Sequence, residues 1–262
     1  MTQYSPQWPE YAAIFGLGSI IGSFLNVVIH RLPKGKSLAY PASHCPNCKR
    51  PVRPWENIPL LSFILLRGKC AGCKSPISWR YPAVEAVTGA LFALILWKTG
   101  WRIELPIYLL MTALLIALSA IDIATMRLPN ALTLTGAIGA IVLTLVLRTH
   151  FWLDMILGAV VGFGLLYLMG LIGSLLFRKE TLGLGDVKLA GMIGLFIGPA
   201  YTAGMYLIGI FLGGLVGGGL ILAGGKKWGE KIPFGPYLAA GSIVSLVWGE
   251  KLWRWYIGLA FR

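Results

Sequence analysis

Two of the three aspartates in this chain fall where acid–base chemistry could use them. Asp122 closes an apolar segment over residues 104–123, and Asp186 opens another over residues 187–197. Ionisable side chains that border lipid are costly and by default mark a functional site. Two carboxylates a few ångströms apart cannot both ionise cheaply, so a close pair shares one proton. One member can then activate a water while the other protonates a leaving amine, which predicts peptide hydrolysis if the two aspartates meet.

Each aspartate also has a purely structural interpretation. Asp186 follows Gly183-Leu184-Gly185 and could cap its helix by accepting backbone N–H bonds. Asp122 could form a surface salt bridge with Arg127, although the helix dipole disfavours an anion at a C-terminus. We expect Gly183 and Gly185 to support the site, either by adopting positive φ or by allowing close approach. No His-Glu-x-x-His or Gly-x-Ser-x-Gly pattern is present, which argues against a metalloprotease or serine hydrolase.

The four cysteines form a second chemical motif. They occur as Cys45-Pro-Asn-Cys48 and Cys70-Ala-Gly-Cys73, which is close to the spacing of a four-thiolate zinc site. Two disulfides are the alternative. A cytosolic location would disfavour disulfides and favour structural Zn²⁺, and four thiolates leave the metal no open position for catalysis.

The composition places these residues in a membrane protein. Hydrophobic residues make up 56% of the 262, charged residues only 13%, and the mean hydropathy is +0.74. A soluble domain carries about 25% charged residues. We therefore expect an all-α polytopic membrane protein with about eight transmembrane helices, three of them shorter than a usual span. The candidate segments are 11–30, 83–97, 104–123, 131–147, 154–177, 187–197, 203–223 and 234–248.

Basic residues predict the orientation. The loop 31–82 holds ten Lys and Arg residues against the single acid Glu56, so it should be cytoplasmic and the N-terminus outside. With eight spans, the same side receives Arg127, Arg178, Lys179, Lys188, Lys226, Lys227 and Lys231. We attribute the net charge of +13 to this topology rather than to nucleic-acid binding. The alternation of helices also places Asp122 and Asp186 at one membrane face and Asp154 at the other.

Taken together, these features resemble the bacterial type IV prepilin leader peptidase/N-methyltransferase family, membrane aspartic proteases of the Gly-x-Gly-Asp group. Besides the cysteine pairs, the resemblance rests on five stretches. These are Gly22-Ser-Phe-Leu-Asn-Val-Val-Ile-His-Arg-Leu-Pro33, Trp55-Glu-Asn-Ile-Pro-Leu-Leu-Ser62, Ile77-Ser-Trp-Arg-Tyr-Pro-Ala-Val-Glu85, Gly183-Leu-Gly-Asp-Val-Lys-Leu189 and Ile232-Pro-Phe-Gly-Pro-Tyr237. The family usually has Asp-x-Asp and Leu-Pro-Asp around its first aspartate. Here Ala124 and Asn130 replace two of those acids, so only Asp122 carries over.

The resemblance implies an enzyme of the bacterial inner membrane with Asp122 and Asp186 as its catalytic pair. It implies removal of a short basic leader from prepilins or type II secretion pseudopilins at the cytoplasmic face, followed by N-methylation with S-adenosylmethionine. We expect a first helix over 1–30, a zinc-binding loop domain with the methyltransferase region over 31–82, and a peptidase domain over 83–262. Glu85 is a weak candidate for binding the methyl donor, and pairing with Arg80 is the favoured structural alternative.

Two other functions remain open at this point. A transporter could use the two acids as an ion site, although transporter sites lie near the bilayer midplane between inverted repeats. A family member could also retain only one of the two activities. Besides the pilin substrates, we expect membrane lipid as a partner, since the basic loop can bind anionic headgroups.

Overall fold

The computed structural model describes residues 6–148, 152–178, 182–225 and 230–260. Within these ranges the chain is helical, with no strand and only two isolated β-bridges. The prediction of an all-α protein is confirmed. The chain forms two compact units, one ending at Leu105 and one beginning at Pro106.

The first unit is built on two long helices, α1 (Trp8–Arg31) and α3 (Arg80–Thr99). They approach closely because glycines face the partner helix: a Cβ on Gly18 would lie 2.8 Å from the Cα of Gly89, and one on Gly22 would lie 2.8 Å from the Cα of Glu85. Small residues allow such contacts between membrane helices. Between α1 and α3 lie η1 (Leu32–Lys34), η2 (Pro54–Asn57) and α2 (Leu61–Leu65). This unit includes α3, and the division into 1–30, 31–82 and 83–262 stays a prediction.

The second unit contains the remaining helices. They are α4 (Leu105–Thr125), α5 (Asn130–Val146), α6 (Trp152–Phe177), α7 (Leu184–Leu222) and α8 (Gly235–Ala260).

Helix α7 consists of two helical segments joined at a corner. Gly198 has φ 72° and ψ 175°, a conformation that favours glycine, and Pro199 follows it. A Cβ on Gly162 of α6 would collide with the carbonyl of Ala190, and the hydroxyl of Tyr206 donates to the carbonyl of the same Gly162. Residues 190 and 206, on either side of Gly198, therefore both lie beside Gly162 of α6. The chain must reverse direction at Gly198 to bring them there. This corner separates the two segments that we predicted over 187–197 and 203–223.

Glycines also hold the first segment of α7 against α6. Gly158 and Gly194 face one another so closely that a Cβ on either would collide with the carbonyl of the other. The second segment of α7 packs on α8 in the same manner: a Cβ on Gly241 would lie 2.5 Å from the Met205 carbonyl and 3.0 Å from the Gly209 nitrogen. Helices α6, α7 and α8 thus form the tightly packed part of this unit.

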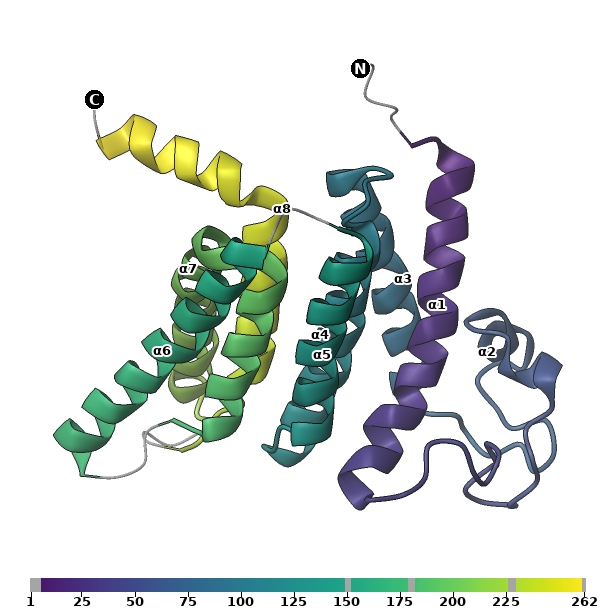
Figure 1. Ribbon diagram of the computed structural model, residues 1–262. Helices are drawn as coiled ribbons and strands as arrows, with labels where there is room; N and C mark the ends of the chain where they lie inside the picture. The colour runs from purple at the N-terminus through teal and green to yellow at the C-terminus, as the bar shows by residue number, and fades with distance from the viewer. Residues whose placement is uncertain (1–5, 149–151, 179–181, 226–229, 261–262) are drawn as a thin grey trace. The chain divides into compact units, whose positions relative to one another are not determined.

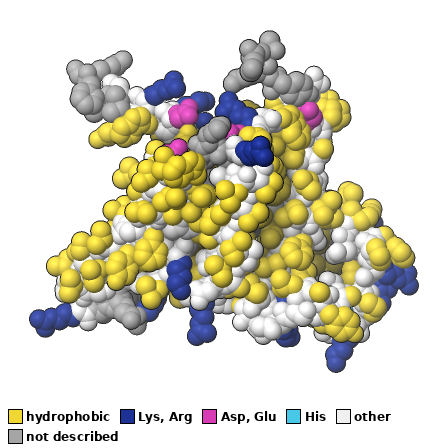
Figure 2. Space-filling model, in the orientation of Figure 1, with side chains coloured by type: hydrophobic (Ala, Val, Ile, Leu, Met, Phe, Trp, Pro, Cys, Tyr) yellow, Lys and Arg dark blue, Asp and Glu magenta, His cyan; other side chains and the backbone are white. Residues whose placement is uncertain are grey.

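Five helices among the described residues are long and apolar enough to cross a membrane. They lie at Trp8–Lys34, Arg80–Thr99, Leu105–Thr125, Trp152–Leu176 and Leu184–Leu222, and the shorter apolar helix Asn130–Val146 accompanies them. Figure 2 shows hydrophobic side chains covering the flanks of the helices. Helix α8 is not among the five, and Glu250 and Lys251 lie within it. The count of eight crossings stays a prediction.

One end of the second unit gathers the features predicted for the cytoplasmic face. In Figure 1 the C-terminal end of α4 and the N-terminal ends of α5, α7 and α8 all face the lower edge of the view. Arg127, Lys188 and Lys231 lie in or beside these helix ends. Lys179, Lys226 and Lys227 were assigned to the same face and lie outside the described residues.

Candidate active site and metal centre

Asp122 lies in the last turn of α4 and is held by the start of α8. Its side chain is only 4% exposed, and its Oδ2 accepts a hydrogen bond of 3.0 Å from the backbone N–H of Gly235. The N-terminus of α8 thus points its positive dipole end at a carboxylate that the C-terminus of α4 disfavours. This contact explains how a buried acid is tolerated there. The ion pair with Arg127 that we considered is absent, since the one ion pair within the described ranges joins Arg50 and Glu56.

Asp186 lies in the first turn of α7 and is partly buried. The residue at the N-cap is Gly183, and no side chain caps this helix, so Asp186 does not serve as the cap that its position suggested. None of the described residues donates a hydrogen bond to its carboxylate. Asp122 lies within electrostatic reach of this carboxylate.

Three contacts bring the start of α7 to the end of α4 and the start of α8. A Cβ on Gly185 would lie 3.2 Å from the Cβ of Leu128, in the connection between α4 and α5. Lys188 Nζ donates to Asn130 Oδ1 at 3.1 Å. A Cβ on Gly235 would lie 3.5 Å from the Leu189 side chain, one turn beyond Asp186. The two aspartates are thus brought to one end of the second unit by local packing around both of them.

Neither of the two glycines before Asp186 has positive φ, and only Gly185 makes a close contact. Gly183 has φ −77° and Gly185 is not among the glycines with positive φ. Positive φ is therefore not the reason for glycine at either position, contrary to one of our two expectations. At Gly185 the reason is close approach, because the first turn of α7 packs directly on Leu128.

Gly235 is a site residue to which we had assigned no role, although it lies in the Ile232–Tyr237 stretch. A Cβ at this position would lie 2.8 Å from Asp122 Oδ2, closer than real Cβ atoms come to other atoms. A Gly-Pro pair at the start of a helix was the available signal, because proline favours the first helical turn. Nothing in the sequence identified Asp122 as the acceptor, 113 positions away.

The cysteine loop folds as two equivalent turns. In the first, the N–H of Cys45 donates to the Arg50 carbonyl and the N–H of Lys49 donates to the Cys45 carbonyl. The second repeats both bonds 25 positions later, from Cys70 to Ser75 and from Lys74 to Cys70. Lys49 and Lys74 both have positive φ, of 57° and 59°. The pattern Cys-x-x-Cys-Lys-x-Pro, which both turns share, indicates this repeat in the sequence, although we did not predict it.

The four sulfurs converge on one point. All four ligand atoms lie within 4.8 Å of one another. Cys45 and Cys73 sulfurs are 3.8 Å apart, and those of Cys48 and Cys70 are 4.0 Å apart. Four ligands at about 2.3 Å from a tetrahedral zinc ion stand about 3.8 Å apart, so the cluster fits such an ion. The cysteines are free rather than disulfide-bonded.

Neighbouring groups stabilise this loop and one of its thiolates. Hydrogen bonds from the Ser75 hydroxyl and backbone lower the pKa of Cys73 to about 6, which favours the thiolate that binds metal. Arg50 pairs with Glu56 and lowers the pKa of that carboxyl, with a further bond from the Arg53 N–H. The ion pair connects the first cysteine turn to η2.

Glu85 has a structural partner, though a different one from that predicted. It is 8% exposed, and its Oε2 accepts a 2.8 Å hydrogen bond from the N–H of Leu60, while Arg80 makes no ion pair with it. Leu60 has φ 60° and ψ −49°, which is strained for a residue with a side chain. Glu85 therefore holds the strained start of α2 against α3.

The chain is similar to known proteins over most of its length. The model of the "Bacterial Peptidase A24 N-terminal domain" matches residues 16–99, and that of the "Type IV leader peptidase family" matches residues 109–218. A protein of Aeromonas hydrophila named "Prepilin leader peptidase/N-methyltransferase" is 36% identical over 95% of this chain and 94% of its own length. Proteins of the same name from Pseudomonas aeruginosa and Neisseria gonorrhoeae are 35% and 34% identical, over 93% and 95% of this chain and 92% and 94% of their own. No solved structure matches.

Proposed function

Because the chain belongs to the type IV leader peptidase family, we propose that it removes the leader peptide from prepilins or pseudopilins and then methylates the new N-terminus. The observation that carries the cleavage activity is the convergence of Asp122 and Asp186 at one end of the second unit. The relatives reported above are named prepilin leader peptidase/N-methyltransferase, and this chain matches nearly their whole length, which supports both activities.

The aspartate pair performs the cleavage as an acid and a base. The ionised carboxylate removes a proton from a water whose oxygen attacks the scissile carbonyl carbon. The protonated carboxyl gives its proton to the nitrogen as the C–N bond breaks, which leaves a carboxyl end on the leader and a free amine on the mature chain. The Gly235 N–H fixes one oxygen of Asp122, so that carboxyl keeps its orientation through both proton transfers.

When bound, S-adenosylmethionine would supply the methyl group for that amine, which would lose a proton while S-adenosylhomocysteine leaves. The unit ending at Leu105 is the candidate for this activity, because it corresponds to the separate N-terminal domain of the family. The structural role that we favoured for Glu85 is supported by its burial and by its hydrogen bond to Leu60.

The four cysteines hold a structural Zn²⁺. Their sulfur separations suit tetrahedral coordination, and four thiolates complete the coordination shell, so the ion stabilises the loop without acting on substrate. Cys45→Ser should reduce the bound zinc of the purified protein from one equivalent to far below it, because three ligands bind less tightly. Elemental analysis measures this loss, and Ser43→Ala is the matched control. Full zinc content in the Cys45→Ser protein would contradict the assignment.

The protein resides in the bacterial inner membrane with its N-terminus outside and its cysteine loop in the cytoplasm. Ten basic residues in that loop support this orientation, as do Arg127, Lys188 and Lys231 beside the aspartates. The reversal of α7 at Gly198 divides this helix into two segments, which supports a count of eight crossings. Trypsin added to inside-out vesicles should cut the cysteine loop, and trypsin added to right-side-out spheroplasts should not; the reverse result would contradict the orientation.

The cleavage activity is tested by co-expression with a prepilin and by the mass of the mature N-terminus. The wild type should yield a chain that lacks its leader and carries one methyl group. Asp122→Asn and Asp186→Asn should each leave the leader in place, whereas Asp154→Asn should cleave normally. Asp154 is the matched control because it is the one remaining aspartate and lies in the first turn of α6. Normal cleavage by either Asp122→Asn or Asp186→Asn would refute the proposed pair.

A further inference from the structure

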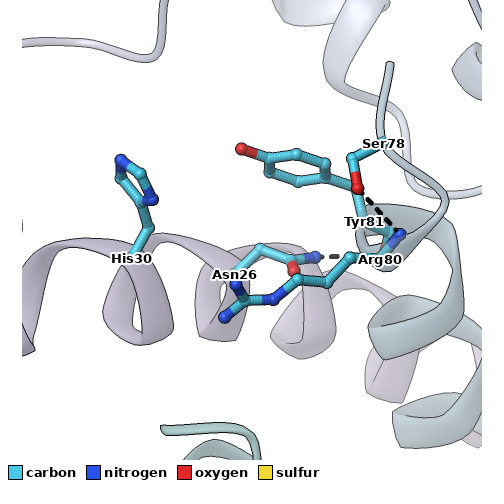
Figure 3. Close-up of a pocket in the computed structure, with 5 residues that line it drawn as sticks. All are labelled: Asn26, His30, Ser78, Arg80 and Tyr81. Carbon is cyan, nitrogen blue, oxygen red and sulfur yellow. Dashed lines mark hydrogen bonds between the residues drawn. The ribbon is translucent and has the colours of Figure 1, made fainter. Parts of the chain in front are cut away.

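A small polar hollow lies in the first unit, between the end of α1 and the start of α3. It encloses about 150 Å³ and is lined by Asn26, His30, Ser78, Arg80 and Tyr81 (Figure 3). All five side chains are polar, and none belongs to the aspartate pair or the cysteine cluster. The amide, imidazole, hydroxyl and guanidinium groups of these residues can form hydrogen bonds with a small polar ligand.

The floor of the hollow carries a buried acceptor without a donor. Asn26 is 5% exposed, and its Nδ2 donates to the Tyr81 carbonyl at 3.1 Å. Within the described part of the chain, no group donates to its Oδ1. A buried amide oxygen left unpaired costs free energy, so a ligand with an N–H donor would satisfy it.

The wall of the hollow is cationic. Figure 3 shows the Arg80 guanidinium beside Asn26, with the Tyr81 ring directed towards the side on which His30 lies. The guanidinium forms no ion pair among the described residues. Further positive charge acts on His30 from Lys34, Lys36 and Arg31 as well as from Arg80. No acid lines the hollow, so its electrostatic complement is an anion such as a carboxylate.

The Arg80 guanidinium can bind an anion, and the buried Asn26 Oδ1 beside it can accept a hydrogen bond from an ammonium. Together they suit a ligand that carries an anion and an ammonium a few ångströms apart. The amino-acid end of S-adenosylmethionine has this chemistry, and so does the headgroup of phosphatidylethanolamine. We infer that the hollow binds the amino-acid end of S-adenosylmethionine, with its carboxylate on Arg80 and its ammonium on Asn26 Oδ1. The inference rests on the proposed methyltransferase function and assigns that function a site. The hollow accommodates only this end of the ligand, so the adenosyl group lies outside it.

Binding of the demethylated product, S-adenosylhomocysteine, tests the site without turnover. The full chain is purified in lipid-free detergent and titrated calorimetrically as wild type, as Arg80→Gln and as Arg102→Gln. Loss of a charged hydrogen-bonding partner should weaken binding to Arg80→Gln by about tenfold or more. Arg102→Gln removes the same charge from the same unit, away from the hollow, and should bind like the wild type. Zinc content and circular dichroism show that each variant is folded.

A second ligand identifies which end of the molecule Arg80 contacts. 5′-Methylthioadenosine has the adenosyl group but no amino-acid end, so it should bind the wild type and Arg80→Gln with equal affinity. The inference is overturned if S-adenosylhomocysteine binds Arg80→Gln as tightly as the wild type. It is equally overturned if both ligands lose the same affinity, because Arg80 would then not contact the amino-acid end.

A titration with lipid distinguishes S-adenosylmethionine from phosphatidylethanolamine as the ligand of the hollow. If the hollow holds a phosphatidylethanolamine headgroup, added phosphatidylethanolamine binds the wild type more tightly than Arg80→Gln, whereas S-adenosylhomocysteine does not distinguish them. This outcome overturns the inference while methylation by the wild type still stands. A wild type that cleaves prepilin but adds no methyl group and binds no S-adenosylhomocysteine overturns both the methyltransferase function and the site.

Discussion

Replacing Gly235 by alanine tests the link between α8 and the aspartate pair. The added Cβ would lie 2.8 Å from Asp122 Oδ2 and 3.5 Å from the Leu189 side chain. Either the carboxylate or the start of α8 must move by roughly half an ångström to restore an ordinary contact. That movement weakens the 3.0 Å hydrogen bond from the Gly235 N–H, which orients the Asp122 carboxylate.

The expected magnitude follows from that hydrogen bond. A bond to a charged group contributes about 1.5 to 3 kcal/mol. If the transition state depends on the carboxylate orientation that this bond imposes, its loss raises the barrier by up to that amount and lowers kcat/KM by about 10- to 100-fold, at about 1.4 kcal/mol per factor of ten. The assay is cleavage of a purified prepilin by the detergent-solubilised protein, with initial rates read from the mass of the mature N-terminus.

Gly164→Ala is the matched control. Gly164 lies in α6, and a Cβ there would meet nothing within 4 Å, so its cleavage rate should equal that of the wild type. Both variants should unfold near the wild-type temperature. A wild-type rate for Gly235→Ala would refute the role of the α8 N-terminus in positioning Asp122. An equal loss in Gly164→Ala would show that glycine replacement acts through the membrane fold instead.

Two further predictions concern packing. Gly194→Ala places a Cβ against the Gly158 carbonyl and should destabilise the second unit by about 1 to 3 kcal/mol. Its unfolding temperature should be lower than that of Gly164→Ala. Equal unfolding temperatures would contradict the tight contact between α6 and α7. Glu85→Gln weakens the hydrogen bond from the Leu60 N–H and should make trypsin cut near Arg67 about tenfold faster. Glu104→Gln is the control. An unchanged rate of cutting in Glu85→Gln would show that α2 keeps its position without this hydrogen bond.

Much of the architecture was predictable because helix and membrane signals are local. Each predicted apolar segment overlaps a helix, and the Cys-x-x-Cys pairs indicated a cluster that the structure brings within 4.8 Å. The reversal at Gly198 was also readable in part, since Gly-Pro interrupts the apolar run. Errors arose where a side chain had two possible partners. Glu85 was assigned to Arg80, its neighbour in sequence, and instead binds the N–H of Leu60, 25 positions away.

Residue types and their spacing determined that this chain is an apolar helical protein with four metal-competent thiols and very few acids. Those properties depend on composition and on neighbours within a few positions, so they can be read without a fold. Only the tertiary structure decided what surrounds each acid: the N-terminus of α8 on Asp122, and the Leu128 connection against the glycine before Asp186. Such contacts join helices from distant parts of the chain, and their free energy depends on packing that no local pattern encodes.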